Sequence, residues 1–154
     1  ENCHYGTVHG CMTLGSESVH DWNVIMRNCT ADNTNNVLWL KMRPDTPQHY
    51  EFVRVENFTG KCRNCLLIKG WTQFYEKQER PDMPISQCHD ITFKGINMNC
   101  GNFFNVAKSD KFILKNFTFE DCDVKDGTPQ FDGKLIENTV VRNVKINGET
   151  IANQ

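Results

Sequence analysis

Two short stretches of the sequence contain side chains that suit a binding or acid–base site. The first, VHGCMTLGSE, contains His9, whose imidazole exchanges a proton near neutral pH. The second, NNVLWLKMRPDT, contains Trp39, Lys41 and Arg43. Lysine supplies a point positive charge, arginine a planar fork of donors, and tryptophan an aromatic face that can lie against a sugar ring. These groups form one site only if the fold brings the two stretches together.

The alternation of polar and apolar residues predicts where these side chains lie. Four segments align as short strands with one buried face: residues 11–15, 37–41, 65–69 and 103–107. The side chains expected to point inward are Met12, Leu14, Leu38, Leu40, Leu66, Ile68, Phe104 and Val106. Those expected to point outward are Thr13, Trp39, Leu67 and Asn105, then Gly15, Lys41, Lys69 and Ala107. The same alternation places His9 on the outer face, beside Trp39 and Lys41.

An internal repeat indicates the fold that positions these strands. Six units align on Asn2, Asn28, Asn57, Gly95, Asn116 and Asn143. Each unit has a charged residue just before this position and an apolar residue just after it. Asparagine and glycine tolerate left-handed backbone angles, so they suit a sharp bend between two short strands. The length of the units is typical of one turn of a right-handed parallel β-helix.

We therefore predict an all-β fold: a right-handed parallel β-helix of about five to six coils, forming a single domain over residues 1–154. Residues 69–87 are expected to form an inserted loop, in which Trp71, Phe74 and Tyr75 either wall a cleft or form a small satellite core. Because equivalent side chains of neighbouring coils lie about 4.8 Å apart, the corner asparagines should form a hydrogen-bonded ladder.

Three of the corner asparagines, Asn28, Asn57 and Asn116, also match the N-glycosylation sequon. The repeat accounts for them without a sugar, so we favour the structural role.

Eight cysteines raise the alternatives of disulfides, zinc ligands and buried thiols. Cys62 and Cys65 have zinc-knuckle spacing, but neither a second pair nor a spaced histidine pair follows them. We expect no metal site and no cofactor. Most cysteines are interpreted as buried free thiols, with Cys3 and Cys29 as neighbours in one buried stack.

The composition excludes several classes of partner. A net charge of −2 with mixed signs provides no positive field for nucleic acid or an anionic membrane. No apolar run approaches the roughly 20 residues of a membrane span, and we expect no signal peptide within these residues.

The motifs resemble those of glycoside hydrolase family 28, the polygalacturonases and rhamnogalacturonases. Residues 8–10 stand at the family's Gly-His-Gly motif and residues 39–41 at its Arg-Ile-Lys motif. The stretch CHDITFKGINMNCGNFFNVAKSDKFILKNFTFEDC is similar to the terminal coils of bacterial pectinases of this kind. The resemblance implies a parallel β-helix that hydrolyses pectin with inversion, outside the cytoplasm (secreted, periplasmic or at the cell surface). Its polysaccharide partner would be pectin, an oligogalacturonide or rhamnogalacturonan.

The resemblance also implies roles for individual residues. His9 would support the acid–base machinery, and Lys41 would help to hold a galacturonate carboxylate. Trp39 stands where the family has arginine, and Arg43 could restore the missing fork. The alternatives without a functional role are that His9 is a solvated or capping histidine, that Lys41 is an ordinary charged residue at the end of a strand, and that Trp39 packs under a loop.

Two family motifs, Asn-Thr-Asp and Asp-Asp, have no counterpart in this sequence. They supply the two carboxyl groups that an inverting glycosidase needs. The aspartates at 21, 32 and 45 are interpreted as turn and loop residues. We therefore expect the C-terminal part of such an enzyme, without hydrolytic activity of its own and with an uncapped first coil that promotes self-association. The alternatives are a non-catalytic β-helix that binds polysaccharide, such as an adhesin module, and, least favoured, a calcium-dependent lyase.

Overall fold

The protein folds into one β-sheet that is mostly parallel. The structure, a computed structural model, describes residues 1–71 and 82–152. The strands are β1 (His4–Tyr5), β2 (Met12–Leu14), β3 (His20–Trp22), β4 (Ile25–Met42), β5 (His49–Gly70), β6 (Ser86–Val106), β7 (Phe112–Asp126), β8 (Val140–Ile146) and β9 (Glu149–Ile151). A single turn of 3-10 helix, η1, covers Gly133–Leu135. The predicted all-β class is confirmed.

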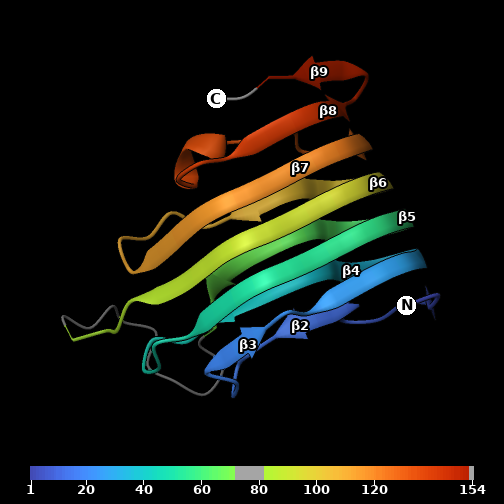
Figure 1. The fold of residues 1–154 in the computed structure, drawn as a ribbon. Helices are drawn as coiled ribbons and strands as arrows, with labels where there is room; N and C mark the ends of the chain where they lie inside the picture. The colour runs from blue at the N-terminus through green and yellow to red at the C-terminus, as the bar shows by residue number, and fades with distance from the viewer. Residues whose placement is uncertain (72–81, 153–154) are drawn as a thin grey trace.

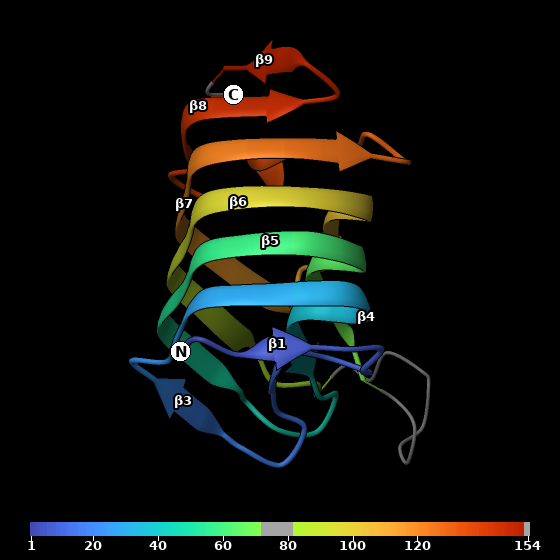
Figure 2. The same cartoon turned by 90° about the vertical axis from the view of Figure 1, so that its right-hand side faces the viewer.

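Neighbouring strands follow chain order. The main path is β1-β4-β5-β6-β7-β8-β9, while β2 pairs with β4 and β3 with β5. Within the described ranges only the β8–β9 pair is antiparallel. Figures 1 and 2 show β4 to β8 stacked one above another, with β1 to β3 at one end of the stack and β9 at the other. Residues at equivalent positions of neighbouring long strands therefore lie side by side in the stack.

The predicted alternation matches the packing of the inward-facing side chains, but two of the residues expected to point outward are buried as well. Leu38, Leu66 and Phe104 occupy one register position in β4, β5 and β6 and belong to the hydrophobic core. Trp39 and Leu67, one residue on, are also buried but lie outside that core. On the face opposite the core, Trp39 and Leu67 are therefore covered while Lys69 and Asn105 are exposed, and the predicted site lies on this face.

The long strands bend at residues with left-handed backbone angles. One column of corners runs through Asn2, Asn28, Asn57, Gly95, Asp121 and Asn143, whose φ values lie between 50° and 65°. The amide of Asn57 donates to Asn28 at 3.0 Å, and that of Asn143 donates to Asp121 at 2.7 Å. The predicted asparagine ladder is confirmed for the Asn28–Asn57 pair, whereas Asn143 bonds to an aspartate that was not predicted at this corner.

One residue, Asn116, was wrongly assigned to that column. Asn116 belongs to a second column of corners, which contains Asn23, Phe52, Asp90, Asn116 and Asn138. Asp121 takes the place expected for Asn116, because aspartate also tolerates the left-handed conformation. The residues around the two corners follow the same polar–apolar pattern, so the pattern alone did not separate them.

The inserted segment is shorter than predicted. β5 continues to Gly70 and β6 begins at Ser86, so both ends of the expected loop 69–87 belong to strands. Phe74 and Tyr75 lie outside the described residues. Among the described residues, no helix is long and apolar enough to cross a membrane.

Six of the eight cysteines are buried free thiols, as expected, while Cys11 is half-buried. The expectation for Cys3 was wrong, because this residue is exposed although Cys29 is buried. β1 lies at the end of the strand order, where β4 covers it from one side only. Hydrogen bonding to Cys100 and burial raise the pKa of Cys62 and of Cys65, so both favour the thiol over the metal-binding thiolate.

Candidate functional site

The structure brings together His9, Trp39 and Lys41, as the alternation predicted. The ring centroids of His9 and Trp39 are 5.1 Å apart, and the Nζ atom of Lys41 lies 4.5 Å from the Trp39 centroid. β2 and β4 are paired, with Thr13 beside Trp39. The side-chain amide of Asn36 donates to the carbonyl oxygen of His9 at 2.8 Å, which fixes the backbone that carries the imidazole.

Trp71, the residue that follows β5, completes the cluster formed by His9, Trp39 and Lys41. Its ring centroid is 4.0 Å from Lys41 Nζ and 5.5 Å from the centroid of Trp39, which it meets edge to face. Lys41 therefore lies over the rings of two indoles, an arrangement that favours a cation. Burial lowers the pKa of Lys41, and the charge of Glu17 opposes that shift.

Trp39 does not offer an open aromatic face. Only 5% of its surface is exposed, and its Nε1 atom is buried without a hydrogen-bond partner among the described residues. His9, Lys41 and Trp71 all pack against the ring. The geometry therefore favours packing under neighbouring side chains over direct stacking on a sugar.

Arg43 already holds a carboxylate of this chain. Its Nε and Nη2 atoms each donate to Asp45 at 2.8 Å, and this hydrogen bonding lowers the pKa of Asp45. The Nη1 atom of Arg43 also donates to the carbonyl oxygen of Ser16 at 3.5 Å. A ligand carboxylate would have to displace Asp45 to use the same fork.

A ladder of amides, which no sequence pattern predicted, lies next to His9. The Nδ2 atom of Asn64 donates to Asn36 at 2.9 Å, and Oδ1 of Asn64 accepts from Asn102 at 3.1 Å and from Asn105 at 3.0 Å. Asn36, Asn64 and Asn102 occupy equivalent register positions of β4, β5 and β6, and this recurrence in the sequence could have indicated the ladder.

The amide ladder and the aromatic cluster border one groove of about 210 Å³. Its lining comprises His9, Asn35, Asn36, Trp39, Arg63, Asn64, Leu67, Lys69, Asn102 and Asn105. These side chains offer amide hydrogen bonds and two positive charges. None of these lining residues is a carboxylate, so the groove suits a polar, negatively charged ligand. A larger groove of about 470 Å³ follows the second corner column and contains none of the predicted site residues.

The three aspartates considered in the sequence lie elsewhere. Asp21 and Asp32 belong to strands β3 and β4 and not to turns, whereas Asp45 lies in the loop after β4. Asp21 accepts from Ser18 at 2.7 Å, and Asp32 pairs with His4 at 3.2 Å. None of these contacts involves His9.

No family model, curated protein or solved structure matches this chain.

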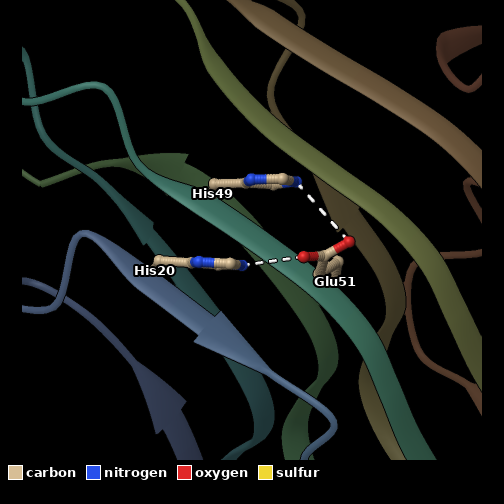
Figure 3. Close-up of side chains that lie close together, drawn as sticks. All are labelled: His20, His49 and Glu51. Carbon is tan, nitrogen blue, oxygen red and sulfur yellow. Dashed lines mark hydrogen bonds and ion pairs between the residues drawn. The ribbon is translucent and has the colours of Figure 1, made fainter.

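A second cluster of polar side chains was missed in the sequence. His20, His49 and Glu51 converge on the β3–β5 pair (Figure 3), and His89 of β6 adjoins them. The histidines are separated by the lengths of whole strands and loops, so no short motif marked them.

Proposed function

We propose that this chain binds a uronate-containing polysaccharide of the pectin type in the groove beside His9 and Lys41. The observation that carries the proposal is a groove lined by amides and two cations, Arg63 and Lys69, without a carboxylate. Lys41 is not part of that lining, but its ammonium group lies over the Trp39 ring, which is, and its register partner is Lys69. A sugar acid presents both hydroxyl groups for the amides and a carboxylate for the cations. Trp39 would then act by holding Lys41 in place.

We further infer a right-handed parallel β-helix of the family 28 type. The in-register stacking of β4 to β8 and the two columns of left-handed corners support this finer fold. In this proposal the chain belongs to a secreted, periplasmic or cell-surface pectinase that hydrolyses galacturonate-containing polysaccharide with inversion.

Hydrolysis with inversion needs a general acid and a general base roughly 6.5–9.5 Å apart. The groove lining supplies neither, so in this proposal residues 1–154 recognise the polysaccharide and the acid–base carboxyl groups come from outside them. His9 would then adjust a catalytic carboxyl group, and His9→Ala would lower kcat/KM about 100-fold in an active protein that contains this chain.

The same lack of carboxylates favours a second candidate, a non-catalytic polysaccharide-binding or adhesin module. Reducing-sugar release from polygalacturonate by an active longer protein that contains this chain distinguishes the two. Release abolished by mutation of the groove supports the hydrolase, and binding without any release supports the module.

The binding step is tested with oligogalacturonate and its methyl ester, which keeps the sugar ring but removes the charge. Lys41→Met keeps the alkyl chain between the indoles and should weaken oligogalacturonate binding about 10- to 100-fold, because a charge-assisted contact contributes about 1.5–3 kcal/mol. Binding of the ester should change little. Lys145→Met, at an exposed lysine on β8, is the matched control. Equal losses for both ligands, or no binding by the unmodified chain, would contradict the proposal.

A further inference from the structure

Four metal-ligating side chains converge on three neighbouring strands. His20 comes from β3, His49 and Glu51 from β5, and His89 from β6. The strand register places His20 beside His49 and Glu51 beside His89. Since His49 and Glu51 are two residues apart on one strand, their side chains point to the same side of the sheet. Figure 3 shows His20 and His49 as parallel rings whose outer nitrogens point toward the Glu51 carboxylate.

The donor atoms of His20, His49 and Glu51 lie within 4.8 Å of one another, and His89 approaches His49 and Glu51. His20 Nε2 is 2.8 Å from Glu51 Oε1, and His49 Nε2 is 3.9 Å from Glu51 Oε2. His89 Nε2 is 2.7 Å from His49 Nε2 and 3.5 Å from Glu51 Oε2. Ligands at about 2.0–2.1 Å from a tetrahedral zinc ion are themselves about 3.3 Å apart. The four contacts given above, from 2.7 to 3.9 Å, bracket that value, so small movements of these side chains would bring the donors of each pair to the spacing that zinc requires.

A further carboxylate sets the tautomer that a metal needs. His89 Nδ1 lies 2.7 Å from Asp90 Oδ2. An ionised carboxylate only accepts hydrogen bonds, so Nδ1 of His89 carries the proton and Nε2 presents a lone pair. The 2.7 Å contact between the two Nε2 atoms then needs a proton on His49, which an incoming cation would displace. Carboxylate–histidine–metal arrangements of this kind are usual around zinc.

We propose that His20, His49, His89 and Glu51 bind a divalent transition-metal ion, Zn²⁺ in the first instance, with Asp90 orienting His89. Imidazole nitrogen with one carboxylate oxygen suits zinc, whereas calcium and magnesium require oxygen ligands. The site is accessible, because the His20 side chain is 52% exposed while Glu51 is 16% exposed.

The bound ion would have a structural effect, because it connects three strands. β3 has only three residues and pairs with β5 alone among the described strands. A metal that joins His20 to His49 and His89 would hold this short strand against β5 and β6. The inference is independent of the proposed polysaccharide groove, since the two clusters share no residue.

The test is zinc titration of the chelator-treated full chain by calorimetry, together with its melting temperature with and without zinc. We expect one zinc ion per chain and a rise in Tm that grows with zinc concentration. His49→Gln and Glu51→Gln should each weaken binding by at least about 100-fold, and Asp90→Asn by about 10- to 100-fold. His4→Gln, which removes an exposed histidine paired with Asp32 elsewhere on the sheet, should leave the affinity unchanged.

Cobalt absorption distinguishes this site from the cysteines. Co²⁺ bound by nitrogen and oxygen shows visible d–d bands without the near-ultraviolet charge-transfer band of a thiolate ligand. A thiolate band in the unmodified chain, equal zinc affinity in His49→Gln and Glu51→Gln chains that retain the native circular dichroism spectrum, or no saturable zinc binding would overturn the proposal. In each case the histidines would form only a hydrogen-bonded surface network.

Discussion

At the scale of single residues, a buried tyrosine of β5 positions the backbone of Lys41. Tyr50 is fully buried, and its hydroxyl group donates to the carbonyl oxygen of Lys41 at 2.8 Å. Burial raises the pKa of Tyr50, so the hydroxyl stays protonated and remains a donor. This hydrogen bond anchors the backbone that carries the candidate ligand-binding ammonium group.

We expect Tyr50→Phe to lower the free energy of unfolding by about 0.5–1.5 kcal/mol, because the Lys41 carbonyl loses its side-chain partner while the ring remains packed. Urea denaturation measures the loss. Tyr5→Phe, at a partly buried tyrosine of β1, serves as the control and should change stability by less than about 0.5 kcal/mol. A Tyr50→Phe chain as stable as the unmodified protein would show that this bond contributes nothing net.

At the scale of elements, the bends of the long strands depend on residues that tolerate the left-handed conformation. Phe52 is the exception in the second corner column, with φ at 52° and 46% of its surface exposed. Its neighbours in that column are asparagine or aspartate. The left-handed conformation costs most residues about 1–2 kcal/mol, so this corner is strained.

We expect Phe52→Asn to raise the free energy of unfolding by about 1 kcal/mol, because asparagine relieves the strain at the cost of one edge contact with His89. The reverse exchange at the neighbouring corner, Asn23→Phe, should lower it by a similar amount. Thermal and urea unfolding of both variants provide the measurement. Destabilisation by Phe52→Asn would mean that the aromatic contact outweighs the backbone strain.

The amide ladder stabilises the adjacent strands β4, β5 and β6. Asn64 makes three side-chain hydrogen bonds and is buried. Asn64→Ala should destabilise the fold by about 1–3 kcal/mol, because buried amide groups of the neighbouring asparagines lose their partner. Asn35→Ala, at an exposed residue of the same groove, is the control. Similar unfolding curves for both variants would contradict the structural role of the ladder.

At the scale of the whole molecule, the two ends of the sheet differ. β9 turns back antiparallel on β8, whereas β1 is paired on one edge only among the described strands. Trp22 and Val19, near that end, are more than half exposed. Unpaired strand edges and apolar surface favour association with another chain.

We therefore expect the isolated chain to self-associate through the β1–β3 end as its concentration rises. Light scattering coupled to size-exclusion chromatography over a concentration series measures this. Trp22→Lys adds a charge to the exposed surface beside this edge and should shift the equilibrium toward the monomer. A monodisperse monomer at every concentration, for both chains, would rule out the association.

The sequence by itself determined the all-β class, the core-facing alternation and the proximity of His9 to Trp39 and Lys41. The first two features are local, because alternation along a strand depends on a few adjacent residues. The proximity of His9 to Trp39 and Lys41 followed from aligning residues 11–15 with residues 37–41, which lie one repeat unit apart. The polysaccharide-binding role of this cluster stays a prediction.

Only the tertiary structure decided which distant residues meet. The assignment of Asn116 to the second corner, the packing of Trp71 over Lys41 and the convergence of His20, His49 and His89 all depend on the number of residues between one strand and the next. A difference of one residue in a connection would turn each following side chain to the other face of its strand. Where the connection lengths depart from the repeat, the contacts between strands could not be deduced before the register was known.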